Sequence, residues 1–409
     1  MIPQNILVVN QPLNNRGDEA AHRALIHGLL KSFPEASIVV LSFEDHNNYI
    51  ADFIVDDSRV EYNRFMFNRS YRMHDVLVGS TQMGCTKFAT RIHPLLRHLI
   101  PIYQKADIVV CAPGGICMGG FQSWQHLFFL QLAKELNKKI IYYSRSIGPF
   151  PESTWLNRRF RDVSYNLMRY FSFLSLRDRK SEIWAKNISV SFIPTVDTAF
   201  LEQPKVVIPE SIRKNLKEKY VIFVPNQLTW HYMYKDVPNS NVEALFINTM
   251  KILRKEFLEH QIVMLPQICS LGDRGDYSFF VKLKERCGDD NVYVVPDTYG
   301  SDIQQTIISK ASMVVGARYH TIVFSINNEV PFMAFSYEAK ITGLLEVLGM
   351  QDHLIDITQS LNEQKEICAL EEKIASRIKY LRNQSVSNKK AIDIAGRCLD
   401  CMKETIQKL

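Results

Sequence analysis

Arg318 and His320 combine the side chains that chemistry on an anion needs. They lie in the run SMVVGARYHTIVFSINNEVPFMAF, where an apolar strand is followed by a turn at Gly316 and then by a segment of helical period. This pattern places both residues at the first turn of a helix, where backbone amides and the helix dipole also attract a phosphate or carboxylate. In the alternative interpretation, Arg318 is a solvated surface residue and His320 caps the helix.

The loop NNRGDEA, residues 14–20, follows the first predicted strand and opens a helix. Asn14 and Asn15 can hydrogen-bond the hydroxyls of a sugar, and Asp18 can accept a proton from one of them. Asp18 can equally be the N-cap of the helix, and both interpretations stay open. For Glu19 we prefer the structural role of a first-turn acid that the helix dipole stabilises.

Other candidate residues also follow predicted strands. Gly114 and Gly115 would let a ligand approach the backbone, although a tight turn explains them nearly as well. In SLRDRKS, Asp178 is expected to cap a helix, and Arg177 either binds an anion or pairs with Asp178. The second half adds three plausible cleft residues, Asn226, Gln267 and Asp276.

Short apolar runs alternate with longer segments of helical period, which predicts βα units on parallel sheets. The predicted strands lie near 6–9, 108–111, 140–143, 173–175, 221–224, 262–265, 292–294, 313–315 and 332–334. A polar, proline-containing passage at 201–219 separates the two halves. We therefore expect an α/β protein with two doubly wound, Rossmann-like domains, 1–205 and 206–409, that face a central cleft as in GT-B-like proteins.

Composition excludes several classes of protein. The chain has 409 residues, 46% of them hydrophobic and 22% charged, which is enough for two ordinary cores. The net charge of +6 suits anionic substrates or an acidic lipid surface, but we expect no nucleic acid as a partner. No apolar run approaches the roughly 18 residues of a membrane span, and the start resembles no signal peptide, so a cytoplasmic location is expected.

The eight cysteines are scattered and are expected to be reduced thiols. Cys398 and Cys401 form a C-x-x-C pair, but it lies in a helical pattern and has no second pair of ligands. Neither zinc nor another metal is expected.

A larger pattern surrounds the Arg-x-His motif. The run KASMVVGARYHTIVFSINNEVPFMAFSYEAKITGLLEVLG resembles the C-terminal signature of the polysaccharide pyruvyl transferase family. NNRGDEA, APGG, SLRD and VDTAF occur in the order that this family shows, so the resemblance spans nearly the whole chain. The glycine loop departs from the family by reading PGGICMGG without an unbroken triple glycine, and 59–104 has no clear family motif.

The resemblance implies transfer of a pyruvyl group from phosphoenolpyruvate onto two hydroxyls of a sugar, forming a ketal and releasing phosphate. A donor with a carboxylate and a phosphate requires two cationic groups, for which Arg318 and Arg177 are the candidates. His320 is the candidate general acid and Asp18 a candidate base. Gly114, Gly115 and Lys340 would lie beside the donor, although Lys340 is almost equally expected to face solvent. The reaction requires no metal and no cofactor.

The resemblance also implies an acceptor in a cell-surface glycan precursor, often lipid-linked. Of the two predicted domains, the first would hold this acceptor through Asn14 and Asn15, and the second would hold the donor. The segment 87–105 interleaves basic and apolar residues and could rest on the inner face of the cytoplasmic membrane. In the alternative, it is an amphipathic helix that packs on the first domain and is broken before Pro101.

Two other functions stay open at this point, because fold does not decide function. A glycosyltransferase that uses a nucleotide sugar would have the same two-domain architecture. A non-catalytic carbohydrate-binding protein would keep the cleft without needing His320.

Overall fold

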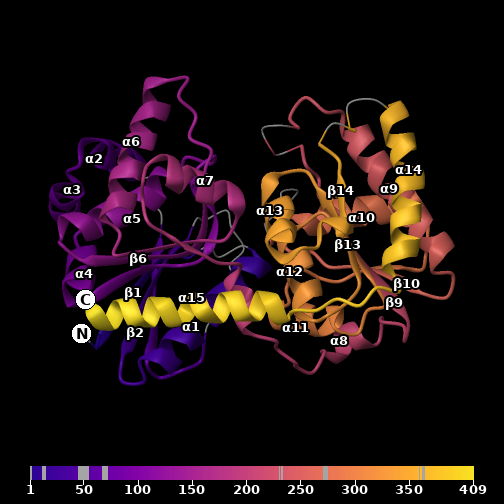
Figure 1. Ribbon diagram of the computed structural model, residues 1–409, viewed down its shortest axis with the longest axis horizontal. Helices are drawn as coiled ribbons and strands as arrows, with labels where there is room; N and C mark the ends of the chain where they lie inside the picture. The colour runs from indigo at the N-terminus through magenta and orange to yellow at the C-terminus, as the bar shows by residue number, and fades with distance from the viewer. Residues whose placement is uncertain are drawn as a thin grey trace.

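The computed structural model describes residues 2–11, 15–44, 55–66, 72–229, 231, 234–269, 275–358, 360–361 and 364–409, and the structural statements below concern these residues. The predicted α/β class is confirmed, because two separate sheets of parallel strands lie side by side, each surrounded by helices (Figure 1). The first sheet is built before residue 195 and the second after residue 219.

The first sheet has the strand order β3-β2-β1-β4-β6-β7-β8, with β5 paired to β6. Its strands are β1 (Asn5–Gln11), β2 (Ser37–Glu44), β3 (Val60–Met66), β4 (Ile108–Cys111), β5 (Gly114–Gly119), β6 (Lys139–Gly148), β7 (Phe173–Leu176) and β8 (Ile193–Pro194). Ile6 and Val8 of β1 enter one hydrophobic core, and Leu7 and Val9 enter another. Helices therefore cover both faces, which explains why these strands are continuous apolar runs.

The helices of the first domain are α1 (Arg16–Ser32), α2 (Met73–Met83), α3 (Thr86–Ile92), α4 (Leu99–Lys105), α5 (Trp124–Glu135), α6 (Trp155–Tyr170) and α7 (Arg179–Asn187). The segment 87–105 is thus divided between α3 and α4. The helix is interrupted at 93–98, before Pro101 as the alternative expected, but Pro101 itself lies in the first turn of α4, where a missing N–H is tolerated.

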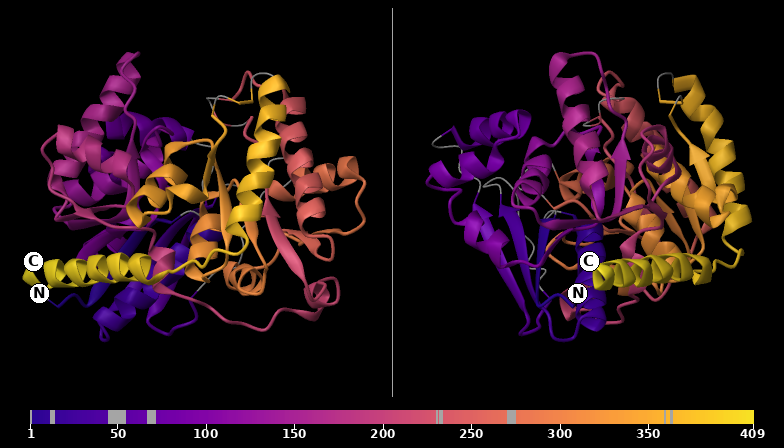
Figure 2. Two further views of the ribbon diagram at one scale, coloured as in Figure 1. Left: turned by 45° about the vertical axis from the view of Figure 1, so that its right-hand side comes forward. Right: turned by 60° about the vertical axis from the view of Figure 1, so that its left-hand side comes forward.

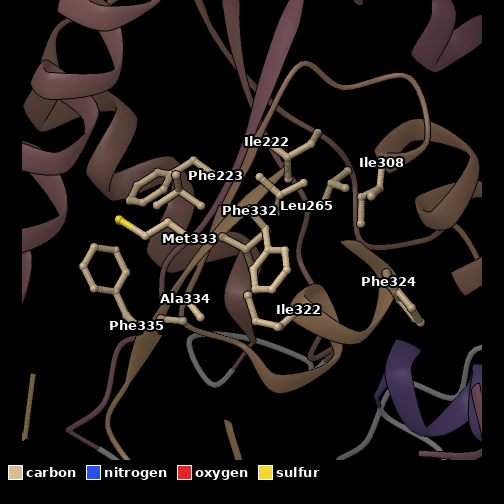
Figure 3. Close-up of a cluster of buried hydrophobic side chains, with 14 of the residues drawn as sticks. Ile222, Phe223, Leu265, Ile308, Ile322, Phe324, Phe332, Met333, Ala334 and Phe335 are labelled. Carbon is tan, nitrogen blue, oxygen red and sulfur yellow. The ribbon is translucent and has the colours of Figure 1, made fainter. Parts of the chain in front are cut away.

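The second sheet has the order β11-β10-β9-β12-β13-β14. Its strands are β9 (Tyr220–Val224), β10 (Gln261–Met264), β11 (Val292–Val294), β12 (Val314–Gly316), β13 (Phe332–Ser336) and β14 (Leu354–Asp356). The helices are α8 (Glu210–Arg213), α9 (Asn239–Glu256), α10 (Asp276–Cys287), α11 (Ser301–Ile308), α12 (Tyr319–Asn327), α13 (Ala339–Leu348) and α14 (Gln364–Leu381). Phe223, Phe332 and Phe335 belong to the hydrophobic core around this sheet (Figure 3).

Both sheets reverse their strand order at one point, between β1 and β4 in the first domain and between β9 and β12 in the second. In doubly wound sheets, ligands bind at the carboxyl ends of the strands at this switch point. Residues 15–18, 112–115 and 317–320 come shortly after β1, β4 and β12 and lead into α1, β5 and α12. The fold therefore directs the motifs predicted from the sequence to the expected edge of each sheet.

The last helix, α15 (Lys389–Lys408), returns to the first domain and runs along it (Figures 1 and 2). Its buried stripe packs into the core of the first sheet through Cys398, Met402 and Ile406. The segment 206–409 is therefore not a single domain, because its final helix is part of the first domain's core.

Gly119 is tightly constrained by its neighbour Gly148. The two residues pair between β5 and β6, Gly119 has a φ of 136°, and a Cβ at this position would lie 2.4 Å from the backbone nitrogen of Gly148. Gly119→Ala is therefore expected to destabilise the protein by on the order of 1–3 kcal/mol. Urea unfolding followed by circular dichroism measures this change.

Gly396→Ala is the matched control, because Gly396 lies inside α15 and a Cβ there meets nothing within 4 Å. Alanine is the better helix former, so this variant is expected to gain up to about 1 kcal/mol. Equal stability of the two variants would show that Gly119 is not constrained in this way.

Candidate active site

Arg318 is the N-cap residue of α12, directly after β12, as the sequence predicted. Its guanidinium forms an ion pair with Asp276, the first residue of α10. Asp276 also accepts hydrogen bonds from the backbone amides of Gln267 and Ile268, both at 3.0 Å. Arg318 is buried, which contradicts the alternative of a solvated surface arginine.

His320 lies in the first turn of α12 and is also buried. Its Nε2 lies 3.4 Å from Oδ2 of Asp197. A Cβ at position 17 would lie 1.8 Å from Cγ of His320, so only glycine leaves room for this ring. The glycine of NNRGDEA in the first domain therefore packs directly on the histidine of the second.

Asp197 connects the two domains electrostatically. It is fully buried, forms an ion pair with Arg177 and approaches His320. Burial alone would raise the pKa of this carboxyl group, but the charges of Arg177 and His320 outweigh burial and lower the pKa to about 2. Asp197 is therefore ionised at neutral pH.

Sequence reasoning recognised the motif VDTAF but assigned Asp197 no role. From its neighbours in the sequence, Asp197 could be recognised only as a helix cap. Its carboxylate does accept a hydrogen bond of 3.0 Å from the amide of Ala199 at the start of a short 3-10 helix. Its charged partners are remote in the sequence.

Arg177 follows β7 and is buried at the same place. Its Nε donates a hydrogen bond of 3.3 Å to Oγ of Ser146, and its guanidinium lies 4.9 Å from the ring centroid of Tyr319 in α12. Arg177 does not pair with Asp178, which instead caps α7 by accepting hydrogen bonds from Ser181. Capping by Asp178 was predicted correctly.

The loop after β1 contributes mainly structural contacts. Asn15 is the N-cap of α1, because its side chain accepts a hydrogen bond of 2.8 Å from the amide of Gly17. The N-cap interpretation of Asp18 was therefore wrong. The carboxylate of Asp18 is buried, pairs with no described residue and lies close enough to Arg177 to favour the charge of that guanidinium. Asn14 lies outside the described residues.

Glu19 has a structural role, as preferred, but it acts on another helix. One carboxylate oxygen accepts hydrogen bonds from the amide and hydroxyl of Ser301, at 2.9 and 3.0 Å, and so caps α11 of the second domain. The other oxygen pairs with Arg16 at 2.9 Å. Arg16 in turn donates a hydrogen bond of 2.6 Å to the carbonyl of Asp297.

The glycine loop begins with Gly114 and Gly115 in β5. Gly115 faces open space, because a Cβ there meets nothing within 4 Å. Behind the loop lies Arg145, a fully buried arginine that sequence reasoning missed. Its guanidinium donates hydrogen bonds to the carbonyl oxygens of Ala112 and Gly115, at 2.5 and 3.5 Å, and so fixes the backbone of the glycine loop.

A cleft of about 460 Å³ lies between the two domains. Asp178 lines it from the first domain and Lys340 from the second. Lys340 is only 15% exposed and its Nζ lies 3.3 Å from Oε1 of Glu338, which contradicts the expectation of a solvent-facing lysine. Arg318, Arg177 and His320 do not line this cleft but lie buried beside it.

Comparison with known proteins decides the family. The model of the polysaccharide pyruvyl transferase family matches residues 15–339, which is most of the chain and includes every residue of the cluster around Asp197. The chain belongs to the polysaccharide pyruvyl transferase family. A relative, the amylovoran biosynthesis protein AmsJ of Erwinia amylovora, is 22% identical over 379 residues, covering 87% of this chain and 88% of the relative. This family member is therefore a transferase of polysaccharide biosynthesis.

Solved structures support the fold. A putative UDP-N-acetylglucosamine 2-epimerase from Listeria monocytogenes is 10% identical with a TM-score of 0.60, covering 100% of this chain and 98% of that one. The UDP-GlcNAc 2-epimerase of Neisseria meningitidis, bound to UDP-GlcNAc, is 11% identical with a TM-score of 0.55, covering 99% and 100%. At these identities the likeness shows the fold alone, which is the GT-B arrangement. No helix in the described part of this pyruvyl transferase is both long and apolar enough to cross a bilayer.

Asp197→Asn is expected to destabilise this pyruvyl transferase at neutral pH and to reduce its sensitivity to acid. Because the folded pKa of about 2 lies below the ordinary value, the charge of Asp197 contributes stability above about pH 4, which is lost as the pH falls towards 2. The amide removes this contribution and leaves Arg177 buried without a carboxylate, a loss of on the order of 3 kcal/mol. Urea unfolding at pH 7 and pH 3 measures both effects, and the difference from wild type should shrink at pH 3.

Asp393→Asn serves as the control, because its pair with Arg397 at 2.7 Å lies on the exposed face of α15. Removing this pair should change stability by less than about 1 kcal/mol at either pH. An equal loss for Asp197→Asn at both pH values would contradict the assigned role of its charge.

Proposed function

We propose that the protein moves a pyruvyl group from phosphoenolpyruvate onto two hydroxyls of one sugar in a cell-surface polysaccharide precursor, releasing phosphate. The observation that carries the proposal is the cluster of Arg177, Asp197 and His320, in which an arginine of the first domain and a histidine of the second meet at one buried carboxylate. Membership of the pyruvyl transferase family and the similarity to AmsJ support the choice of reaction and of polysaccharide.

Arg177 and Arg318 would bind the carboxylate and phosphate of the donor. Each guanidinium is held by an aspartate, Asp197 or Asp276, so its direction is fixed before the substrate arrives. Nη2 of Arg177 donates to no described residue and is available to an anion. The open space at Gly115 would let the substrate approach the backbone.

The reaction then proceeds by acid-base steps. His320 gives a proton to the methylene carbon of the donor, the central carbon is attacked by one sugar hydroxyl, and Asp18 takes the proton of that hydroxyl. The bond between the central carbon and the phosphate oxygen breaks, and the second hydroxyl attacks the same carbon to close the ketal. The proton that the first hydroxyl loses replaces the one that His320 gives to the methylene carbon. The proton that the second hydroxyl loses leaves with the phosphate. We propose that no metal or other cofactor takes part.

His320→Gln tests the general acid. Glutamine keeps hydrogen-bonding capacity but carries no titrating proton, so donor affinity should be largely kept while turnover falls on the order of 100-fold or more. Isothermal titration with phosphoenolpyruvate measures the affinity. Phosphate release in the presence of a cell-derived polysaccharide precursor measures turnover.

His353→Gln is the matched control, because His353 stacks on Phe332 in the core of the second domain. It should keep turnover near that of wild type. Unchanged turnover in His320→Gln would remove the histidine from the mechanism. Binding of a UDP-sugar but not of phosphoenolpyruvate to the wild-type protein would instead overturn the proposed reaction.

We also propose that one face of the first domain rests on an anionic membrane that carries the acceptor. Phe88 and Ile92 of α3 are 64% and 60% exposed, and Arg91 between them is exposed too. At the start of α6, Trp155 is 61% exposed, and it lines a surface hollow together with Met83 of α2. Exposed aromatic and aliphatic side chains mixed with arginines suit the interface of a bilayer with acidic lipids.

The triple variant Phe88→Ser, Ile92→Ser, Trp155→Ser is expected to lose most of its binding to vesicles that contain phosphatidylglycerol, because its apolar contacts with the interface are gone. Co-sedimentation with these vesicles and with pure phosphatidylcholine vesicles measures binding. Leu258→Ser is the control, because Leu258 is even more exposed, at 76%, but lies on the second domain. Vesicle binding that the triple variant retains would rule out this face.

A further inference from the structure

The cleft between the domains has a composition that suits a sugar. Its volume of about 460 Å³ lies within the usual range for small-molecule sites and exceeds what a three-carbon donor would fill. Aromatic and charged side chains line it: Trp184, Phe121, Tyr337, His231, Asp178, Glu338, Asp356, Lys180 and Lys340.

Trp184 of α7 is held rigidly at this cleft. A Cβ at Gly148 would lie 2.3 Å from Cδ1 of Trp184, so the indole packs directly on a backbone that has no side chain. The ring of Phe150 meets it edge to face, with centroids 5.4 Å apart and an interplanar angle of 81°. Its Nε1 donates to no described residue, so the indole presents both an apolar surface and a hydrogen-bond donor to a ligand.

The charges of the cleft do not favour an anion. Burial would raise the pKa of Glu338, but Lys340 and His231 outweigh burial and lower the pKa to about 2, so the carboxylate is ionised. Glu338 thereby offsets the charge of Lys340, and Asp178 and Asp356 together outweigh Lys180, so these lining residues carry no excess of positive charge. Such walls offer phosphoenolpyruvate no net attraction, whereas the hydroxyls of a neutral sugar can donate hydrogen bonds to the carboxylates.

The cleft also borders the candidate catalytic cluster. Asp178 lines the cleft and is the direct neighbour of Arg177 in the chain. On the opposite wall, a Cβ at Gly343 of α13 would lie 3.4 Å from Cβ of Asp178, so the two domains meet at this point. A ligand in the cleft can therefore extend one end towards Arg177 and His320.

We propose that this cleft is the acceptor subsite, in which a pyranose ring stacks on Trp184 and donates hydrogen bonds from its hydroxyls to Asp178, Glu338 or Asp356. This inference rests on the proposed function, because it assigns the donor to the neighbouring cluster. Lys340, which sequence reasoning placed beside the donor, then belongs to the acceptor side through its pair with Glu338.

The test uses three probes, methyl β-galactoside, methyl α-mannoside and methyl N-acetyl-β-glucosaminide, with saturation-transfer NMR on the full chain. At least one probe should receive saturation from the wild-type protein. Trp184→Ala should weaken that binding on the order of tenfold, because the stacking surface is lost. Trp184→Phe, which keeps an aromatic ring, should restore most of it.

Tyr380→Ala is the matched control, because Tyr380 is an exposed aromatic residue outside the cleft. It should bind the glycoside like wild type. Phosphoenolpyruvate affinity, measured by isothermal titration, should be unchanged in Trp184→Ala and shows that this variant is folded. If Trp184→Ala does not fold, Asp356→Asn replaces it and should weaken the same signal.

The outcomes separate the two proposals. Equal glycoside binding by wild type and Trp184→Ala, or no binding of any probe to wild type, overturns the acceptor subsite. Glycoside binding that depends on Trp184 in a protein that does not bind phosphoenolpyruvate supports the subsite and overturns the proposed reaction instead.

Discussion

The carboxylate of Asp197 constrains the positions of the two domains. It lies fully buried just before the chain leaves the first domain, paired with Arg177 on one side and approached by His320 of the second domain on the other. A buried carboxylate without partners would cost several kcal/mol, so the folded protein must keep both groups within reach of it. Any relative movement of the domains that separates His320 from Asp197 therefore removes part of this compensation.

The motif NNRGDEA after β1 also fixes the position of the second domain relative to the first. Gly17 packs on the ring of His320, and Glu19 caps α11 of the second domain. The backbone amide of Arg16 also donates a hydrogen bond of 2.9 Å to the carbonyl of Gln267. A motif that the sequence offered as a substrate-binding loop thus holds the domains together through Arg16, Gly17 and Glu19. Of the two described acids of this motif, Glu19 binds Ser301 and Arg16, whereas the carboxylate of Asp18 forms no hydrogen bond or ion pair with a described residue.

Local patterns allowed much of this architecture to be predicted from the sequence. The strands are short apolar runs, and Arg318 and His320 follow Gly316 at a strand-to-helix turn, so their position depends only on neighbouring residues. Asp197 could not be assigned, because its partner Arg177 lies 20 residues away and His320 lies in the other domain. The amphipathic pattern of α15 indicates a buried face but not which domain covers it.

Trp184 shows the same limit at the cleft. An aromatic residue in a helix usually belongs to a core, and nothing near it in the sequence indicates otherwise. Its orientation depends on contacts with the backbone of Gly148 and the ring of Phe150. These residues are remote from Trp184 in the sequence and contact it only in the folded protein. Residues of this kind become visible only when the folded chain brings distant segments together.

The balance of charge at the cluster has a consequence for how a donor would bind. Arg177 and Arg318 are each already paired with an aspartate, so the empty site holds little uncompensated positive charge. A donor with a carboxylate and a phosphate would add negative charge next to Asp197, in surroundings where water cannot screen it. His320, whose Nε2 lies 3.4 Å from Oδ2 of Asp197, is the group of the second domain that such a donor would meet at this carboxylate. If phosphoenolpyruvate binds as proposed, the carboxylate that holds Arg177 in place therefore also lies beside the imidazole proposed as the proton donor.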